Sequence, residues 1–177
     1  MSAASSLSNS RGSEPQRPAY VGPSERRTTA ELPALPGSVA AVPVHDRLVS
    51  VAGLADPPGY SHAVTSSGRL GFVSGQVAVD DAGQLVGAGD LRAQTTQALG
   101  NLHKILRALG ADWPDVVRLG WFLLDASQVQ VVRDARDELL RPALGQLPNP
   151  ASTLIQVPAL FRPDLLVEVE AVAALPA

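Results

Sequence analysis

The sequence contains no cysteine, a single lysine (Lys104) and few aromatic residues. Without cysteine the chain can form no disulfide, no thiolate nucleophile and no Cys-ligated zinc or iron–sulfur site. Two Trp, two Tyr and three Phe offer little surface for stacking bases, and a formal net charge of −3 gives no basic footprint for nucleic acid. We therefore expect no nucleic-acid partner.

Long apolar runs are also absent, because none approaches the ~20 residues that a membrane span needs. No basic stretch followed by an apolar one opens the chain, so no secretory signal is expected. The absence of cysteine is compatible with the cytosol. These observations predict a cytoplasmic protein with no membrane partner.

The sequence lacks the usual patterns of metal-binding and nucleotide-binding sites. The three histidines stand alone, without a second ligand at helical or turn spacing (His45, His62, His103). The glycines between residues 83 and 89 lack the strand–loop–helix spacing of Gly-x-Gly-x-x-Gly. We expect neither a metal nor a cofactor.

Composition divides the chain into two parts. Residues 1–43 are dominated by Ser, Pro, Gly, Arg and Ala without apolar periodicity, which predicts a disordered N-terminal tail. This tail is either a regulatory extension or a stretch that precedes the true start. Residues 44–177 have the size of one domain that can form its own core.

Apolar spacing within residues 44–177 predicts an α+β fold, a mixed β-sheet with two helices packed on one face. One helix should begin at the N-cap Asp90 and end before Gly110, and a second should be capped by Ser127. The expected strands are 47–51, 61–65, 69–79, 118–124, 153–160 and 165–174. Ser66-Ser67-Gly68 predicts a hairpin between the second and third strands.

The last expected strand carries two acidic residues among apolar ones. Alternation places Glu168 and Glu170 on one face of the sheet, opposite Val167, Val169 and Ala171. The two glutamates fit a solvated face or pairs with arginines. They also fit a carboxylate beside a pocket, with a raised pKa, that positions water or carries a proton.

Four short motifs together carry a family resemblance: 60–64 (YSHAV), 72–76 (FVSGQ), 150–157 (PASTLIQV) and 166–172 (LVEVEAV). Residues 46–175 resemble the RidA (YjgF) family of small enamine/imine deaminases. The resemblance implies a chorismate-mutase-like fold and a homotrimer with a small-molecule ligand at the subunit interfaces. It also implies hydrolysis of an enamine or imine.

Site residues follow from the same resemblance. Glu168 matches the catalytic, water-activating glutamate of the family. The tyrosine that borders the ligand pocket corresponds to Tyr60, and the backbone that bonds the bound acid corresponds to Gly75. We expect Ser152 and Thr153 to complete the substrate-binding set.

Ser152 departs from the family, which usually has an arginine here that grips the substrate carboxylate. A charge-assisted bond contributes roughly 1.5–3 kcal/mol and a neutral hydroxyl about 1 kcal/mol, so an acid would bind less tightly. Ser152 fits a strand-start residue, a pocket hydroxyl for a less acidic ligand, or a nucleophile served by His62. The nucleophile interpretation lacks a Gly-x-Ser-x-Gly elbow. Arg133 or Arg162 could supply the guanidinium from another direction.

Two functions follow from these alternatives. The first is a hydrolase that deaminates an enamine-type or imine-type metabolite, with Glu168 positioning water. The second is a non-catalytic module on the same fold that binds a metabolite or a protein.

Deleting residues 1–43 should change the free energy of unfolding by less than ~1 kcal/mol, because this segment has no apolar periodicity to bury. Thermal denaturation of the full chain and of the shortened chain measures the difference. A large fall in melting temperature would mean that the segment packs against the domain.

Overall fold

The computed structural model describes residues 46–176. The tail expected over residues 1–43 lies outside the described residues. The elements, in chain order, are β1 (Asp46–Leu48), β2 (Ala63–Thr65), β3 (Arg69–Gln76), α1 (Leu91–Ala108), η1 (Trp113–Asp115), β4 (Val116–Leu123), η2 (Ala126–Gln128), α2 (Val129–Leu144), β5 (Ala151–Gln156) and β6 (Val167–Leu175).

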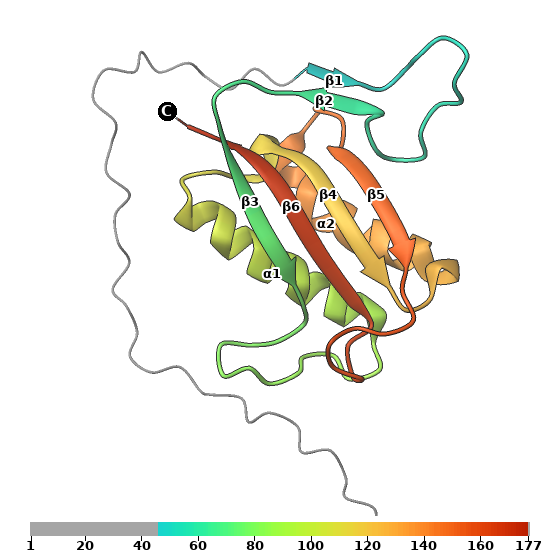
Figure 1. Ribbon diagram of the computed structural model, residues 1–177, viewed down its shortest axis with the longest axis vertical. Coiled ribbons are helices and arrows are strands. Elements are labelled where there is room, and N and C mark those ends of the chain that lie inside the picture. Colours follow the sequence, from blue (N-terminus) through green and yellow to red (C-terminus); the bar gives the residue numbers. More distant parts are fainter. Residues whose placement is uncertain (1–45, 177) are drawn as a thin grey trace, which may run out of the picture. The chain divides into compact units, whose positions relative to one another are not determined.

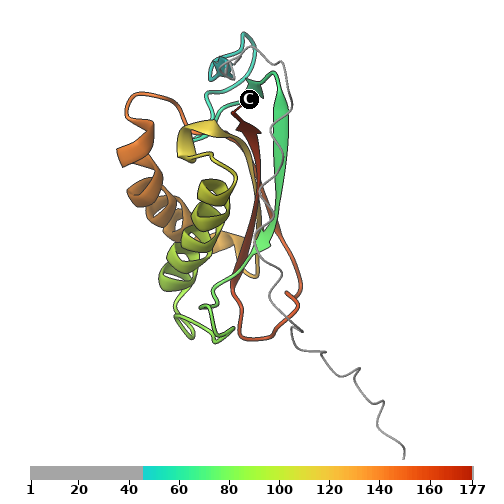
Figure 2. The same ribbon diagram turned by 90° about the vertical axis from the view of Figure 1, so that its left-hand side faces the viewer.

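Four strands form the main sheet in the order β3-β6-β4-β5 (Figure 1). The strand β6 runs antiparallel to both its neighbours, whereas β4 and β5 are parallel. Both helices cover the same face of this sheet (Figure 2). The predicted α+β architecture, a mixed sheet with two helices on one face, is confirmed.

Helix α1 begins and ends where the sequence predicts. The carboxylate of Asp90 accepts a hydrogen bond from the backbone N–H of Ala93 at 3.0 Å. At the other end Gly110 has a φ of +77°, the left-handed conformation that commonly follows a helix. Between these caps, the leucines at three- and four-residue spacing are fully buried (Leu99, Leu102, Leu106). Their burial anchors α1 to the sheet.

The expected cap of the second helix was wrong. Ser127 acts as a donor instead, because Oδ1 of Asp125 accepts hydrogen bonds from the N–H of Ser127 at 3.0 Å and from its hydroxyl at 2.6 Å. Asp125 thereby caps the short η2 turn, and α2 starts only at Val129. An aspartate two residues ahead of the serine therefore turns the expected cap into a donor.

The predicted hairpin was also wrong. Strand β2 pairs with β1, and β3 pairs with β6 in the other sheet. A turn signal fixes only a change of direction, and Gly68 does adopt a positive φ of +88°. Pairing with β6 places Gly71 and Val73 over the core, so a distant partner is preferred to the adjacent strand.

Strand ends differ from the expected ones where a local residue forbids pairing. Strand β5 covers Ala151–Gln156 rather than 153–160. After it, Val157 donates to Leu123 O at 2.9 Å and Pro158 has no N–H to continue the ladder. Strand β3 stops at Gln76 rather than at residue 79.

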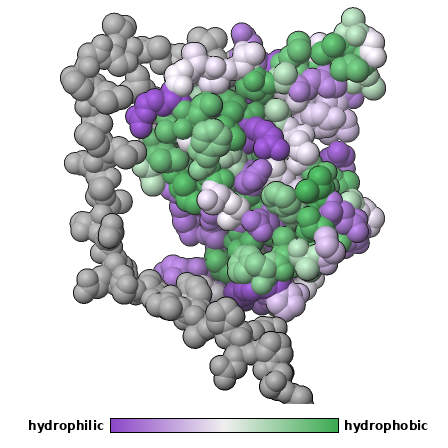
Figure 3. All heavy atoms as spheres, viewed as in Figure 1, coloured by the Kyte–Doolittle hydropathy of each residue, from purple (hydrophilic) through white to green (hydrophobic). Residues whose placement is uncertain are grey.

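The predicted alternation along β6 is confirmed. Val167, Val169 and Ala171 are buried beneath the helices, whereas Glu168 and Glu170 point to the opposite face. No helix within residues 46–176 covers that opposite face, and apolar surface gathers there (Figure 3). Its exposed apolar residues include Leu70 at 46%, Phe72 at 78% and Ile155 at 47%. We call it the open face.

Neither helix of the described part combines the length and apolar character that crossing a membrane requires.

Candidate functional site

The sequence-predicted site residues form two groups on opposite faces of the sheet. Ser152 pairs with Leu119, which is buried under the helices, so its side chain lies on the helix-covered face. Glu168 pairs with Phe122 and lies on the open face. Thr153, next along β5, is exposed on that open face too. Gly75 lies against Glu168 and so is part of the open-face group.

Gly75 lies in a β-bulge directly against Glu168. The β3–β6 register runs from Val73↔Ala171 to Gln76↔Val169. An advance of three residues along β3 therefore matches an advance of two residues along β6. A Cβ added at Gly75 would lie 1.7 Å from Oε1 of Glu168, so any side chain there would displace the carboxylate of Glu168. A glycine within a strand often marks such a bulge, and here it lets Glu168 pack on bare backbone.

Glu168 and Glu170 differ in their partners. Glu170 accepts from Arg118 at 3.3 Å and rests over Gly120. Glu168 makes no hydrogen bond or ion pair with any described residue. Burial raises the pKa of Glu168 above its ordinary 4.5, and the negative charge of Glu170 adds to the shift. The carboxylate paired with arginine is thus Glu170, whereas Glu168 is left unpaired.

Tyr60 is positioned by a buried hydrogen-bond network that joins its loop to the start of β5. Ser61 donates its hydroxyl to Asn149 O at 2.6 Å and its N–H to Pro150 O at 3.2 Å. In return, Nδ2 of Asn149 donates to Gly59 O at 3.1 Å. Sequence analysis missed Asn149, whose only signal was its place between two prolines.

Tyr60 and Ser152 meet at a cavity of about 70 Å³ between α2 and the edge strand β5. Closed small-molecule pockets usually measure roughly 300–1,000 Å³, so this cavity admits only one end of a ligand. Its other lining residues are Trp121, Val129, Val132, Arg133, Arg136 and Leu154.

Two arginines of α2 border this cavity. Arg133, one of the two alternatives considered from the sequence, is half-buried and has no hydrogen bond or ion pair with a described residue. Arg136 was missed by sequence analysis. It is 5% exposed, and its Nε donates to Asp137 at 2.8 Å. Its signal was an arginine on the apolar stripe of the helix.

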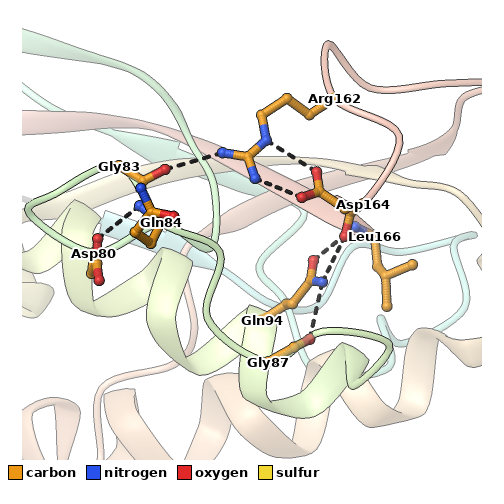
Figure 4. A network of polar contacts seen from close by, with 8 residues as sticks. All are labelled: Asp80, Gly83, Gln84, Gly87, Gln94, Arg162, Asp164 and Leu166. Atoms are coloured by element: carbon orange, nitrogen blue, oxygen red, sulfur yellow. Dashed lines mark hydrogen bonds and ion pairs between the residues drawn. The ribbon is translucent and has the colours of Figure 1, made fainter.

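Arg162, the other alternative, is occupied elsewhere (Figure 4). Its Nε and Nη2 donate to the two carboxylate oxygens of Asp164 at 3.0 and 2.6 Å, and Nη1 donates to Gly83 O at 3.1 Å. Nearby, the buried Gln94 donates to Asp164 O and accepts from the N–H of Leu166 at 2.8 Å. These bonds hold the loop that leads into β6, and with it the position of Glu168.

Ser152 has no hydrogen-bonded base among the described residues. His62 donates from Nε2 to Ala55 O at 3.1 Å and meets the ring of Tyr60 edge-on, with no bond to Ser152. The nucleophile interpretation of Ser152 therefore loses its proposed base. Within residues 46–176 no three His, Asp or Glu side chains are grouped so that they could hold a metal ion.

Comparison with known proteins gives the family. Residues 50–175 match the family model described as Endoribonuclease L-PSP. A RutC family protein of Synechocystis is 32% identical over 66% of this chain and 86% of its own length. The mouse 2-iminobutanoate/2-iminopropanoate deaminase is 37% identical over 64% of this chain and 79% of its own.

A solved structure gives the same result for the fold. The Rid-family protein YyfB of Yersinia pestis superposes with a TM-score of 0.64 at 39% identity, covering 73% of this chain and 98% of the other. The chain belongs to the Endoribonuclease L-PSP family, also called the YjgF/RidA family.

Glu170→Gln should lower the pKa of Glu168, because it removes the neighbouring negative charge. A ¹³C NMR titration of Glu-labelled protein measures the shift, and Glu168→Gln assigns the signal. Glu138→Gln, on the exposed side of α2, is the control and should leave that signal unchanged. An unmoved titration in Glu170→Gln would mean that the two carboxylates do not interact.

The same raised pKa has a consequence for stability. Folding favours the protonated form of Glu168. The contribution of this carboxyl group to the free energy of unfolding is therefore greatest below pH 4.5. That contribution is lost as the pH rises through the higher pKa of the folded state.

Proposed function

We propose that this protein hydrolyses a small enamine or imine, releasing ammonia, with Glu168 positioning the attacking water. The observation that carries the proposal is the unpaired, half-buried carboxylate of Glu168, whose pKa is raised, beside the bare backbone of Gly75. Relatives named as 2-iminobutanoate/2-iminopropanoate deaminases support the same reaction type.

The reaction needs one base and one water molecule. An enamine first becomes the imine as its N–H proton is replaced by a C–H on the neighbouring carbon. Water adds to the carbon of the C=N bond while Glu168 accepts a proton from it and returns that proton to the nitrogen. The hydroxyl proton of the carbinolamine then passes through Glu168 to the nitrogen as the C–N bond breaks, so that imine plus water becomes ketone plus ammonia. A raised pKa suits Glu168 to this exchange, because the group takes up and returns a proton nearer to neutral pH.

In this proposal the substrate binds between two copies of the chain. Glu168 and Gly75 lie on the open face, whereas Tyr60 and Ser152 border the cavity on the helix-covered face. One small molecule cannot reach both groups within a single chain. We therefore assign the open-face group to one subunit and the cavity group to its neighbour, in a cytoplasmic homotrimer.

A second candidate function is favoured by Ser152. Where the family usually has the carboxylate-gripping arginine, this chain has a neutral hydroxyl, as expected of a non-catalytic module that binds a metabolite or a protein. Cleavage of RNA, which the family name suggests, has no comparable support, because a net charge of −3 provides no excess of positive charge for a phosphate backbone.

Hydrolysis is tested with imines generated in place by an amino-acid oxidase, following the loss of the semicarbazide-trapped imine. Glu168→Gln should slow the reaction about 10²- to 10⁴-fold, the usual contribution of a general base. The control Glu138→Gln removes an exposed carboxylate of α2 and should leave the rate unchanged. Wild-type protein that binds the ketone product but hydrolyses no imine would establish the binding module instead.

Assembly is tested by light scattering. Three chains of 18.4 kDa should give a particle of about 55 kDa, because the open face leaves Leu70, Phe72 and Ile155 exposed. Phe72→Glu should dissociate it, whereas Leu54→Glu, at a residue 58% exposed and outside the main sheet, should not. A stable monomer of the wild type at micromolar concentration would contradict the trimer.

A further inference from the structure

We infer that Arg133 and Arg136 of α2, together with the hydroxyl of Ser152, form a binding site for a carboxylate group of the substrate. This inference rests on the proposed function and names its substrate class, an imine or enamine that carries an acid group. The guanidinium usually present on the strand in this family is supplied here from the helix that faces it.

The two arginines that line the cavity favour the binding of an anion. Arg133 has no partner among the described residues. Arg136 is 5% exposed and uses only Nε, so neither of its terminal nitrogens bonds to a described residue. The one carboxylate bonded there, Asp137, also accepts from Asn149 at 3.2 Å. Asp137 therefore offsets the buried charge of Arg136, whereas the half-buried guanidinium of Arg133 is left without a counter-charge at the cavity wall, where an anion would supply one.

The loop opposite α2 makes room for the tip of Arg136. A Cβ added at Gly59 would lie 3.2 Å from Nη2 of Arg136, and the φ of Gly59 is +85°. The turn before Tyr60 favours glycine because of this positive φ, and the tip of Arg136 packs against it. It brings the guanidinium of Arg136 to the wall of the cavity that Tyr60 and Ser152 share.

Ser152 is explained by the same arrangement. An arginine at position 152 would add a third cation to a cavity of about 70 Å³ that already has two. A serine instead supplies a neutral donor for one carboxylate oxygen. Such a small cavity accepts the acid end alone and leaves the reactive carbon outside it, where Glu168 of a neighbouring copy is placed by the proposed function.

The probes are 2-oxobutanoate and its methyl ester, which lacks the negative charge and carries one more methyl group; the variant at Arg133 separates the effect of charge from that of size. Isothermal titration of the full-length wild type should show the acid bound about ten- to a hundred-fold more tightly than the ester, as expected for charge-assisted bonds. Arg133→Gln should abolish this preference. Arg107→Gln on α1, which removes one exposed arginine far along the other helix, should keep it.

A rescue variant tests whether Ser152 and Arg133 face the same ligand. Adding Ser152→Arg to Arg133→Gln should restore the preference for the acid, because it returns a guanidinium to the same cavity. Steady-state kinetics supply a second readout: Arg133→Gln should raise KM for a carboxylate-bearing imine with little change in kcat. Arg136→Met is included only if its circular dichroism and melting temperature match those of the wild type.

The failures of the two proposals are distinguishable. Unchanged preference for the acid in Arg133→Gln, or no preference in the wild type, overturns the carboxylate site even if Glu168→Gln stops hydrolysis. Conversely, Glu168→Gln should keep the preference for 2-oxobutanoate. Loss of that preference with Arg133→Gln supports the site even if no imine is hydrolysed.

Discussion

The antiparallel pairing of β6 with both β3 and β4 is the constraint on which the rest of the structure depends. Because side chains alternate along a strand, this central position buries Val167, Val169 and Ala171 under the helices. The same alternation forces Glu168 onto the open face. A one-residue slip would bury the carboxylate and expose the core, so packing itself holds the catalytic candidate in place.

The edge strand β5 depends on a different set of contacts, made by polar groups. Asn149 and Ser61 exchange bonds with the backbone on either side of Tyr60, which ties the 59–61 loop to the first residues of β5. Buried polar groups of this kind are costly unless every partner is present. These bonds tie the loop that carries Tyr60 to the start of β5, and both border the cavity that the arginines of α2 line.

Sequence periodicity predicted the elements well and their pairing less well. The leucine spacing of α1 and the alternation of β6 are local patterns, and both are confirmed. The hairpin at residues 66–68 was wrong, because a turn signal does not say which strand the next one joins. The cap at Ser127 was wrong because Asp125, two residues earlier, accepts from both the N–H and the hydroxyl of Ser127, and α2 begins only at Val129. The resemblance correctly gave the family, while the roles of the individual site residues stay predictions.

What the sequence by itself determined is local: which residues alternate along β6, where α1 is capped, and that Glu168 lies on a mostly apolar strand. Only the tertiary structure decided which residues far apart in the chain meet. It separated Ser152 from Glu168 across the sheet, and it brought the arginines of α2 to Ser152. The physical reason is that alternation is set by backbone geometry within one strand, whereas proximity depends on non-local packing that buries the helix faces.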